Sequence, residues 1–112
     1  MKLTSLKSNK DFEEFREKRP KRFDGRFLLI LSLEKDIEQP KLGVRISKRV
    51  GNAVRRNRIR RIIRETIRQD IDKIEQNRHY LVIPRQSTKN LSDKKLSLGI
   101  RQDLSRGLGF KL

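Results

Sequence analysis

The segment from Lys41 to Arg68 contains the residues with the clearest chemical meaning in this chain. It has eleven lysines and arginines against a single acid, Glu65. Internal ion pairs cannot use so many like charges, so we expect them to face a polyanion outside the protein. Most of them are arginines, whose planar guanidinium grips phosphate oxygens with two hydrogen bonds and stacks on bases. The segment therefore predicts nucleic-acid binding.

Helical phasing divides the second half of this segment into two faces. At about 100° per residue, the isoleucines fall on one side of a long helix and the arginines fall nearly opposite. The isoleucine side comprises Ile59, Ile62, Ile63, Ile67, Ile71 and Ile74, and the opposite side comprises Asn57, Arg61, Arg64 and Arg68. A solvated helix usually mixes both signs of charge, whereas here only Glu65 offsets the arginines. This favours a binding face over a merely solvated one.

Asn57 is a separate clue, because asparagine is a poor residue for a helix interior. It stands between Arg56 and Arg58, and Arg60 follows on the next turn. Two interpretations stay open. Asn57 is either a tolerated surface residue, or its amide bonds an RNA phosphate, sugar or base edge, or a metal-bound water.

Further candidate contacts lie before this helix. Arg45 and Ser47 share the polar side of an alternating strand, and Lys48 and Arg49 come directly after it. These charges lead to the helix N-terminus, whose free N–H groups suit an anion.

Two phenylalanines near the N-terminus, Phe12 and Phe15, are either core residues of a first helix or exposed rings that stack on unpaired bases. The core interpretation is favoured for Phe15, and the two are even for Phe12. The lone His79 fits a structural or surface role better than a ligand role.

Composition excludes several classes of protein. The net charge is +16 on 112 residues, with no cysteine and one histidine. A thiolate zinc site, a disulfide framework and a His-pair catalyst are therefore not expected, nor is a direct metal site. Neither a signal peptide nor a membrane-spanning run is present, so we expect a cytoplasmic protein. RNA is favoured over duplex DNA, with a ribosomal RNA-binding structural protein, a DNA-binding regulator and a protein-only nuclease as alternatives.

Hydrophobic patterns predict the elements that position these residues. We expect a helix from about Lys10, capped by Ser8 or Asn9 and closed by Pro20, and a long helix capped by Asn52 that reaches about Gln76. The predicted strands are 27–31, 42–47 and 80–83, the first two pairing as a hairpin, and a last helix contains Leu96, Ile100, Leu104 and Leu108. This order predicts one α+β domain over residues 1–112, with helices packed on a small central sheet and a βαβ crossover through the long helix.

The run from Leu42 to Glu65, LGVRISKRVGNAVRRNRIRRIIRE, closely resembles the signature of the bacterial ribonuclease P protein subunit, whose hallmark is Arg-Asn-Arg on a long helix. Asp11-Phe12 resembles the N-terminal helix motif of that family, and the segment from Tyr80 to Arg85 resembles its strand after the long helix. The resemblance covers roughly residues 3–106.

The resemblance implies an α/β sandwich whose βαβ crossover is left-handed, against the general rule. It implies an enzyme only as part of a ribonucleoprotein endonuclease, in which a catalytic RNA uses Mg²⁺ to remove the 5′ leader from precursor tRNA. The protein would bind that leader and support Mg²⁺ affinity, with Mg²⁺ held mainly by the RNA and no protein oligomer required.

Residue roles follow from the same resemblance. The surface for the catalytic RNA would comprise Lys48, Arg49, Arg56, Asn57, Arg58, Arg60, Arg61, Arg64 and Arg68, with Asn57 as a possible indirect metal contact. The leader cleft would comprise Phe12, Arg45, Ser47 and Lys48. Two positions depart from the family pattern, because Arg16 and Ile30 stand where many members have aromatic residues. Leader contact is therefore expected to depend more on charge than on stacking.

Overall fold

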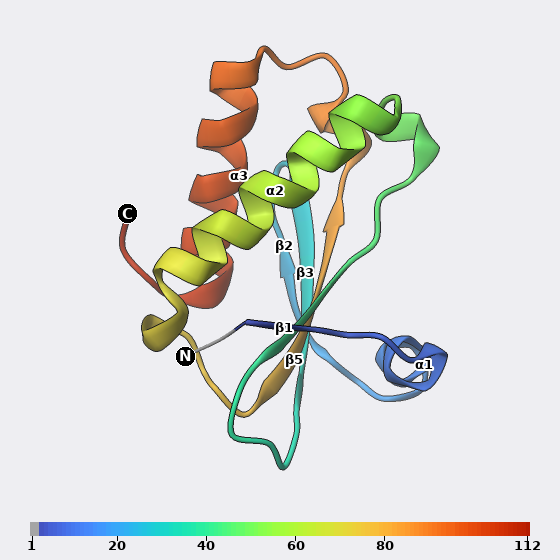
Figure 1. Cartoon of the computed structure of the whole chain (residues 1–112), viewed down its shortest axis with the longest axis vertical. Coiled ribbons are helices and arrows are strands. Elements are labelled where there is room, and N and C mark those ends of the chain that lie inside the picture. The colour runs from blue at the N-terminus through green and yellow to red at the C-terminus, as the bar shows by residue number, and fades with distance from the viewer. Residues whose placement is uncertain (1–2) are drawn as a thin grey trace.

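The computed structural model describes residues 3–112 and folds them into a five-stranded mixed sheet with helices on both faces (Figure 1). The strands are β1 (Thr4–Ser5), β2 (Lys21–Asp24), β3 (Leu28–Glu34), β4 (Lys41–Val44) and β5 (Arg78–Pro84), in the spatial order β1-β4-β5-β3-β2. The α-helices are α1 (Asn9–Glu17), α2 (Ala53–Gln69) and α3 (Asp93–Leu108), and 3-10 turns span Lys48–Val50, Ile71–Lys73 and Gln86–Thr88. The predicted α+β class is confirmed.

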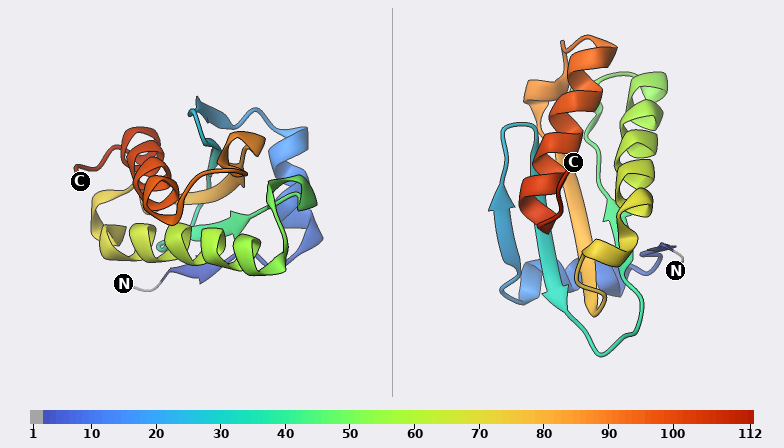
Figure 2. Two further views of the ribbon diagram at one scale, coloured as in Figure 1. Left: turned by 90° about the horizontal axis from the view of Figure 1, so that it is seen from above. Right: turned by 90° about the vertical axis from the view of Figure 1, so that its left-hand side faces the viewer.

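The main core lies between the sheet and the pair α2 and α3, which cover the same face (Figures 1 and 2). Ile59, Ile63 and Ile67 of α2 are at most 1% exposed and share this core with Leu42 and Val82 of the sheet. The predicted isoleucine face is therefore confirmed, and its burial holds the opposite side of α2 outward.

A smaller core lies on the other face of the sheet, beneath α1. It contains Leu6, Phe15, Leu33 and Leu81, all buried. Phe15 is thus a core residue, as favoured from the sequence, whereas Phe12 is only partly buried at the edge of this cluster.

Both predicted helix starts are confirmed. Ser8 Oγ accepts from the N–H of Asp11 at 3.1 Å, and Asn52 Oδ1 accepts from the N–H of Arg55 at 2.9 Å. The predicted end of the long helix near Gln76 is wrong, because α2 ends at Gln69. The amide of Gln76 donates to the carbonyls of Ile71 and Ile74 at 2.6 and 2.7 Å, which closes this stretch as a tight turn.

The predicted pairing of strands 27–31 and 42–47 is also wrong. β5 lies between them, antiparallel to β3 and parallel to β4. The adjacency of neighbouring strands in the chain is only a tendency, and the pairing partner that replaces it here comes from far along the sequence. The edge strands β1 and β2 were not predicted, because β1 has two residues and β2 is mostly exposed and polar.

The crossover from β4 through α2 to β5 joins two parallel neighbours. In the right-hand view of Figure 2 the helices lie in front of the sheet, β4 runs upward, and β5 lies to its left. A right-handed crossover seen from the helix side would place the second strand on the right. The connection is therefore left-handed, as the resemblance implied.

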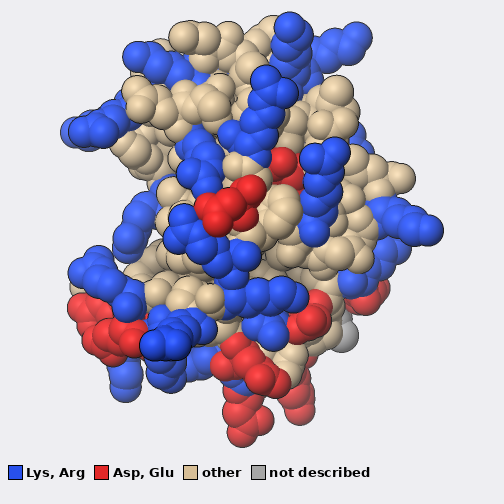
Figure 3. Space-filling view, turned by 180° about the vertical axis from the view of Figure 1, so that it is seen from behind, with Lys and Arg blue, Asp and Glu red and all other residues tan. Residues whose placement is uncertain are grey.

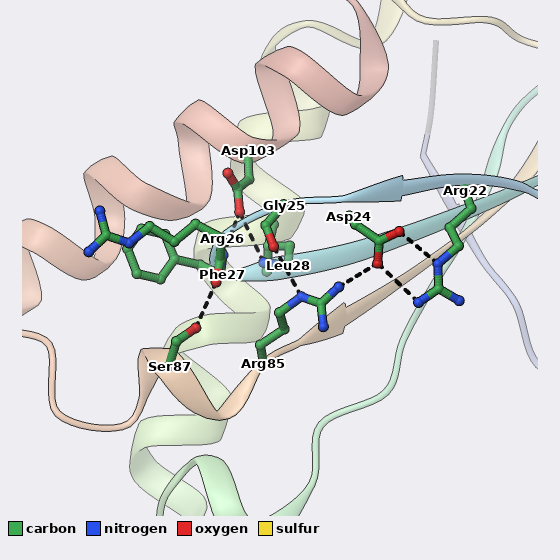
Figure 4. A network of polar contacts seen from close by, with 9 residues as sticks. All are labelled: Arg22, Asp24, Gly25, Arg26, Phe27, Leu28, Arg85, Ser87 and Asp103. Atoms are coloured by element: carbon green, nitrogen blue, oxygen red, sulfur yellow. Dashed lines mark hydrogen bonds and ion pairs between the residues drawn. The ribbon is translucent and has the colours of Figure 1, made fainter.

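A buried carboxylate fastens α3 to the turn between β2 and β3 (Figure 4). Asp103 Oδ2 accepts from the N–H groups of Phe27 at 2.7 Å and Leu28 at 3.0 Å. Only glycine fits opposite, because a Cβ on Gly25 would lie 2.4 Å from Asp103 Oδ2. Arg85 holds the turn from the β5 side by donating to the carbonyl of Gly25 at 3.0 Å.

No helix in the described residues is long and apolar enough to cross a membrane.

Replacing Asp103 with alanine should destabilise the protein by about 2–4 kcal/mol, because the N–H groups of Phe27 and Leu28 would lose their acceptor. Urea denaturation measures this loss. Arg101→Ala, at an exposed position of the same helix, is the control and should change stability by less than about 0.5 kcal/mol. Equal losses in the two variants would contradict the role given to Asp103.

Candidate nucleic-acid interface

The start of α2 is fixed by three residues that follow β4. Ser47 Oγ accepts from the N–H of Arg49 at 3.1 Å and begins a 3-10 turn. Gly51 then has a φ of 157°, and a Cβ there would lie 2.8 Å from Arg55 Cγ. Together with the Asn52 cap, these residues set the path along which the chain enters α2.

Arg55 anchors the same end of the helix to the rest of the protein. Its Nη2 donates to the carbonyls of Thr88 at 2.5 Å and Leu91 at 2.8 Å, across the loop before α3. Sequence reasoning missed this role, because Arg55 resembles its basic neighbours and its acceptors are distant in the chain. Its position within the isoleucine arc was the available signal.

The outward side of α2 presents arginines whose guanidinium groups are available. Arg61 and Arg68 are exposed, and within residues 3–112 neither has a hydrogen-bond or ion-pair partner for its side chain. Arg56 is half-buried and likewise has no such partner in the described chain. These three predicted contacts remain candidates for phosphate binding.

Two other predicted arginines have neutral partners within the protein. Arg60 Nη1 donates to Asn57 Oδ1 at 3.1 Å, and Arg64 Nη1 donates to Ser5 Oγ of β1 at 3.0 Å. Neither partner cancels the positive charge, and each orients the guanidinium. Asn57 Oδ1 accepts from Arg60 with one of its two lone pairs, and the amide NH₂ of this exposed residue can donate to a ligand.

Arg58 differs from the other arginines of the predicted surface because it forms an ion pair with Asp93, at the first residue of α3. The hydrogen bond from Arg58 lowers the pKa of the Asp93 carboxyl, and the same bond raises the pKa of Arg58. A carboxylate therefore occupies the place on Arg58 that a phosphate oxygen would take. In the described chain, Asp93 is the carboxylate that pairs with an α2 arginine.

Lys48 and Arg49 lie exposed on the 3-10 turn before α2, beside Ser47. The hydroxyl of Ser47 is oriented by its role as a cap, so its proton is the part free to meet a ligand. These residues join the start of α2 to the sheet face beneath α1.

The predicted cleft residues Phe12 and Arg45 lie together on that face. Arg45 Cζ is 5.6 Å from the centroid of the Phe12 ring, a cation–π arrangement. Gly43 makes room for the ring, because a Cβ there would lie 2.8 Å from Phe12 Cε1. Arg45 is exposed and Phe12 is half-buried, so this pair offers one ring edge and one charge to a ligand.

Ile30 does not face this cleft. It is 2% exposed and belongs to the core under α2 and α3, where a Cβ on Gly107 would lie 2.7 Å from Ile30 Cδ1. The interpretation that Ile30 replaces a cleft aromatic is therefore wrong. Its neighbour Leu31, partly buried against the α1 core, is on the cleft side of β3. Arg16, the other departure, is exposed on α1.

Three further observations concern the lone histidine, possible metal ligands and the distribution of charge. His79 is buried on β5, and burial lowers the pKa of its imidazole, which fits the structural role favoured from the sequence. Among residues 3–112, no group of three His, Cys, Asp or Glu side chains could hold a metal ion.

Seen from behind the view of Figure 1, lysines and arginines spread over much of the surface, while carboxylates gather mainly in its lower half (Figure 3).

Comparison with known proteins gives consistent matches. The family model described as Ribonuclease P matches residues 1–106. A Clostridioides difficile protein named ribonuclease P protein component is 34% identical over 102 residues, covering 90% of this chain and 89% of that protein. The structure of the Staphylococcus aureus RNase P protein superposes with a TM-score of 0.82 at 29% identity, covering 96% of this chain and 94% of that one.

Asp93→Asn should tighten the binding of a labelled transfer RNA by about two- to fivefold, because an exposed ion pair of modest strength would no longer compete for Arg58. The slope of log affinity against log salt should steepen by about one phosphate contact. Asp72→Asn removes the same charge from an exposed position beyond α2 and is the control. If both variants gain the same affinity for the RNA, the gain reflects net charge, and Asp93 does not compete with RNA phosphate for Arg58.

Proposed function

Since the chain belongs to the ribonuclease P protein family, we propose that it assists a catalytic RNA in removing the 5′ leader from precursor tRNA. The family assignment makes it the protein component of a ribonucleoprotein endoribonuclease, with an RNA partner. It also replaces the ribosomal-protein alternative. Phosphodiester hydrolysis belongs to the RNA in this proposal, and the chain supplies binding and charge.

The observation that carries the proposal is the arginine side of α2, on which Arg61 and Arg68 have no side-chain partner within residues 3–112. Arg61 and Arg68 extend from a helix whose other side is fixed in the core by Ile63 and Ile67. A rigid row of guanidinium groups can neutralise closely spaced phosphates where strands of a folded RNA approach each other. We therefore assign the catalytic RNA to this side of the molecule.

The leader is assigned to the sheet face beside α1. A single strand there would meet the exposed guanidinium of Arg45, the half-buried ring of Phe12 and the nearby Lys48. Because Phe12 already packs against Arg45 and Gly43, it offers an edge more than an open stacking platform. Charge supplies the larger share of leader affinity in this proposal, with limited base preference.

The two assigned surfaces meet at the β1–β4 edge of the sheet. Arg64 reaches Ser5 of β1, and β1 pairs with β4, whose chain continues to Arg45. A precursor tRNA held by the catalytic RNA along α2 could thus extend its leader around this edge. The protein would position both RNAs with one continuous basic surface.

Mg²⁺ enters this proposal through the RNA. The ion prefers oxygen ligands and retains water, and Asn57 Oδ1, which accepts from Arg60, keeps one lone pair that a metal-bound water can reach. The NH₂ of the same amide suits a phosphate or sugar oxygen. The protein would lower the Mg²⁺ demand of the RNA by neutralising phosphates with Arg56, Arg61 and neighbouring arginines.

Adding the protein to its cognate catalytic RNA should restore precursor-tRNA cleavage at Mg²⁺ concentrations at which the RNA alone is inactive. The double variant Arg61→Ala and Arg68→Ala should restore less activity and lower the salt slope of RNA binding by about one unit per lost contact. Lys95→Ala with Arg101→Ala removes two exposed charges from α3 and is the matched control.

Three outcomes would count against the proposal. If the protein changes neither rate nor affinity, the assignment to leader removal fails. If the protein alone cleaves precursor tRNA, catalysis does not belong to the RNA. If the α2 and α3 double variants lose the same amount, the arginine side of α2 is not the binding surface.

A further inference from the structure

A cavity of about 440 Å³ opens between the C-terminal end of α3, the 3-10 turn after α2 and strands β2, β3 and β5. It lies at Lys73, beyond the end of α2, and is therefore separated from the start of α2 by roughly 25 Å of helix. Its lining shares no residue with either surface assigned above. Its volume lies in the range of small-molecule binding pockets.

The floor of this cavity is apolar, aromatic and rigid. Ile30 and Tyr80 are buried there, and Phe23 is half-buried beside them. A Cβ on Gly107 would lie 2.7 Å from Ile30 Cδ1 and 2.9 Å from Phe23 Cδ2, so glycine lets α3 approach the sheet closely. The hydroxyl of Tyr80 donates to the carbonyl of Glu75 at 2.7 Å, which fixes the ring.

The rim of the cavity is positively charged. Lys21 and Arg106 line it from β2 and α3, and within residues 3–112 neither forms an ion pair. Lys73 also lines it and pairs with Asp70 at 3.2 Å. These side chains surround a cavity with few carboxylates, so an anion entering it meets an excess of positive charge.

Two negative groups weaken the attraction of this cavity for an anion. Glu75 lines the cavity and pairs with Arg78, and the pKa of its carboxyl is lowered mainly by that hydrogen bond and further by the charge of Lys21. Lys21 and this carboxylate line the same cavity. The last carbonyls of α3 add partial negative charge, which Arg106 in the last turn offsets. Five cationic side chains line the cavity against one carboxylate. Arg22, Lys73 and Arg78 are each paired with a carboxylate, so Lys21 and Arg106 carry the positive excess.

We propose that this cavity is a second nucleotide site, which holds a phosphate between Lys21, Lys73 and Arg106. The nucleoside would lie against Phe23 and Leu108, on the apolar side of the same cavity. A cationic rim beside an aromatic floor is the combination that binds nucleotides without sequence preference. The phosphate comes either from a free nucleotide or from an RNA strand, because both present the same group. The site does not depend on the function proposed for α2.

Adenosine 5′-monophosphate titrated into the isotope-labelled full chain tests the site directly. We expect saturable shifts of the backbone amides of Gly107 and Gly109, which line the cavity. Inorganic phosphate should bind at least about fivefold more weakly, because it lacks the nucleoside, and adenosine should bind more weakly still. The amides of Gly43 and Gly51 report separately on binding at the cleft and at the start of α2.

The double variant Lys21→Gln and Arg106→Gln should weaken this binding at least about fivefold. Lys95→Gln with Arg101→Gln removes two exposed charges from α3 outside the cavity and should leave it unchanged. Competition by a five-nucleotide RNA with a 5′-hydroxyl would identify RNA as one source of the phosphate, and its absence would restrict the site to free nucleotides. Unshifted Gly107 and Gly109 amides, equal affinity for phosphate and nucleotide, or unchanged binding in the Lys21–Arg106 variant would each overturn the proposal.

Discussion

The burial of the isoleucine side of α2 is the constraint on which the rest of this structure depends. Ile59, Ile63 and Ile67 are almost completely removed from solvent, and this fixes the rotation of the helix about its axis. Any rotation that turned an arginine inward would bury an unpaired charge at high cost. The apolar core therefore directs the basic side of α2 outward, and the repulsion among its arginines is retained in a rigid helix rather than relieved by local acids.

The segment before α2 connects this helix to the sheet face that is assigned to the leader. Gly51 permits a backbone turn that a side chain would obstruct, and Arg55 ties the first turn of the helix to the loop before α3. Arg45 lies just before that turn and packs on Phe12 of α1. Because these contacts tie the segment to α1 and to the loop before α3, the cleft and the arginine side of α2 hold a fixed relation to each other.

Much of the architecture could be predicted because its local signals are strong. The isoleucine period identified α2 and its faces, and the caps Ser8 and Asn52 were predictable from residue type. Strand pairing was not, because the insertion of β5 between β3 and β4 is set by packing between distant segments. Ile30 was matched to a cleft aromatic through the family resemblance, and the continuous apolar run around it has no alternation that would have corrected the match.

The candidate site also has features that the sequence predicts and features that it does not. The sequence predicts which residues are basic and on which side of α2 they lie, and these predictions agree with the exposed positions of Arg61 and Arg68. The sequence does not predict which arginines already have partners within the protein, because Arg58 meets Asp93 and Arg55 meets Thr88 only through the tertiary fold.

The placement of the catalytic RNA along α2 is the central claim, and directed hydroxyl-radical cleavage tests it most directly. The chain contains no cysteine, so a chelated iron can be tethered at one introduced position. Val54→Cys places it on the outer side of α2, where Val54 is 76% exposed, and Asp36→Cys places it on the exposed loop between β3 and β4. The account predicts cleavage of the assembled catalytic RNA from the Val54 position and little from the Asp36 position, whereas equal cleavage from both, or cleavage from Asp36 alone, would contradict it.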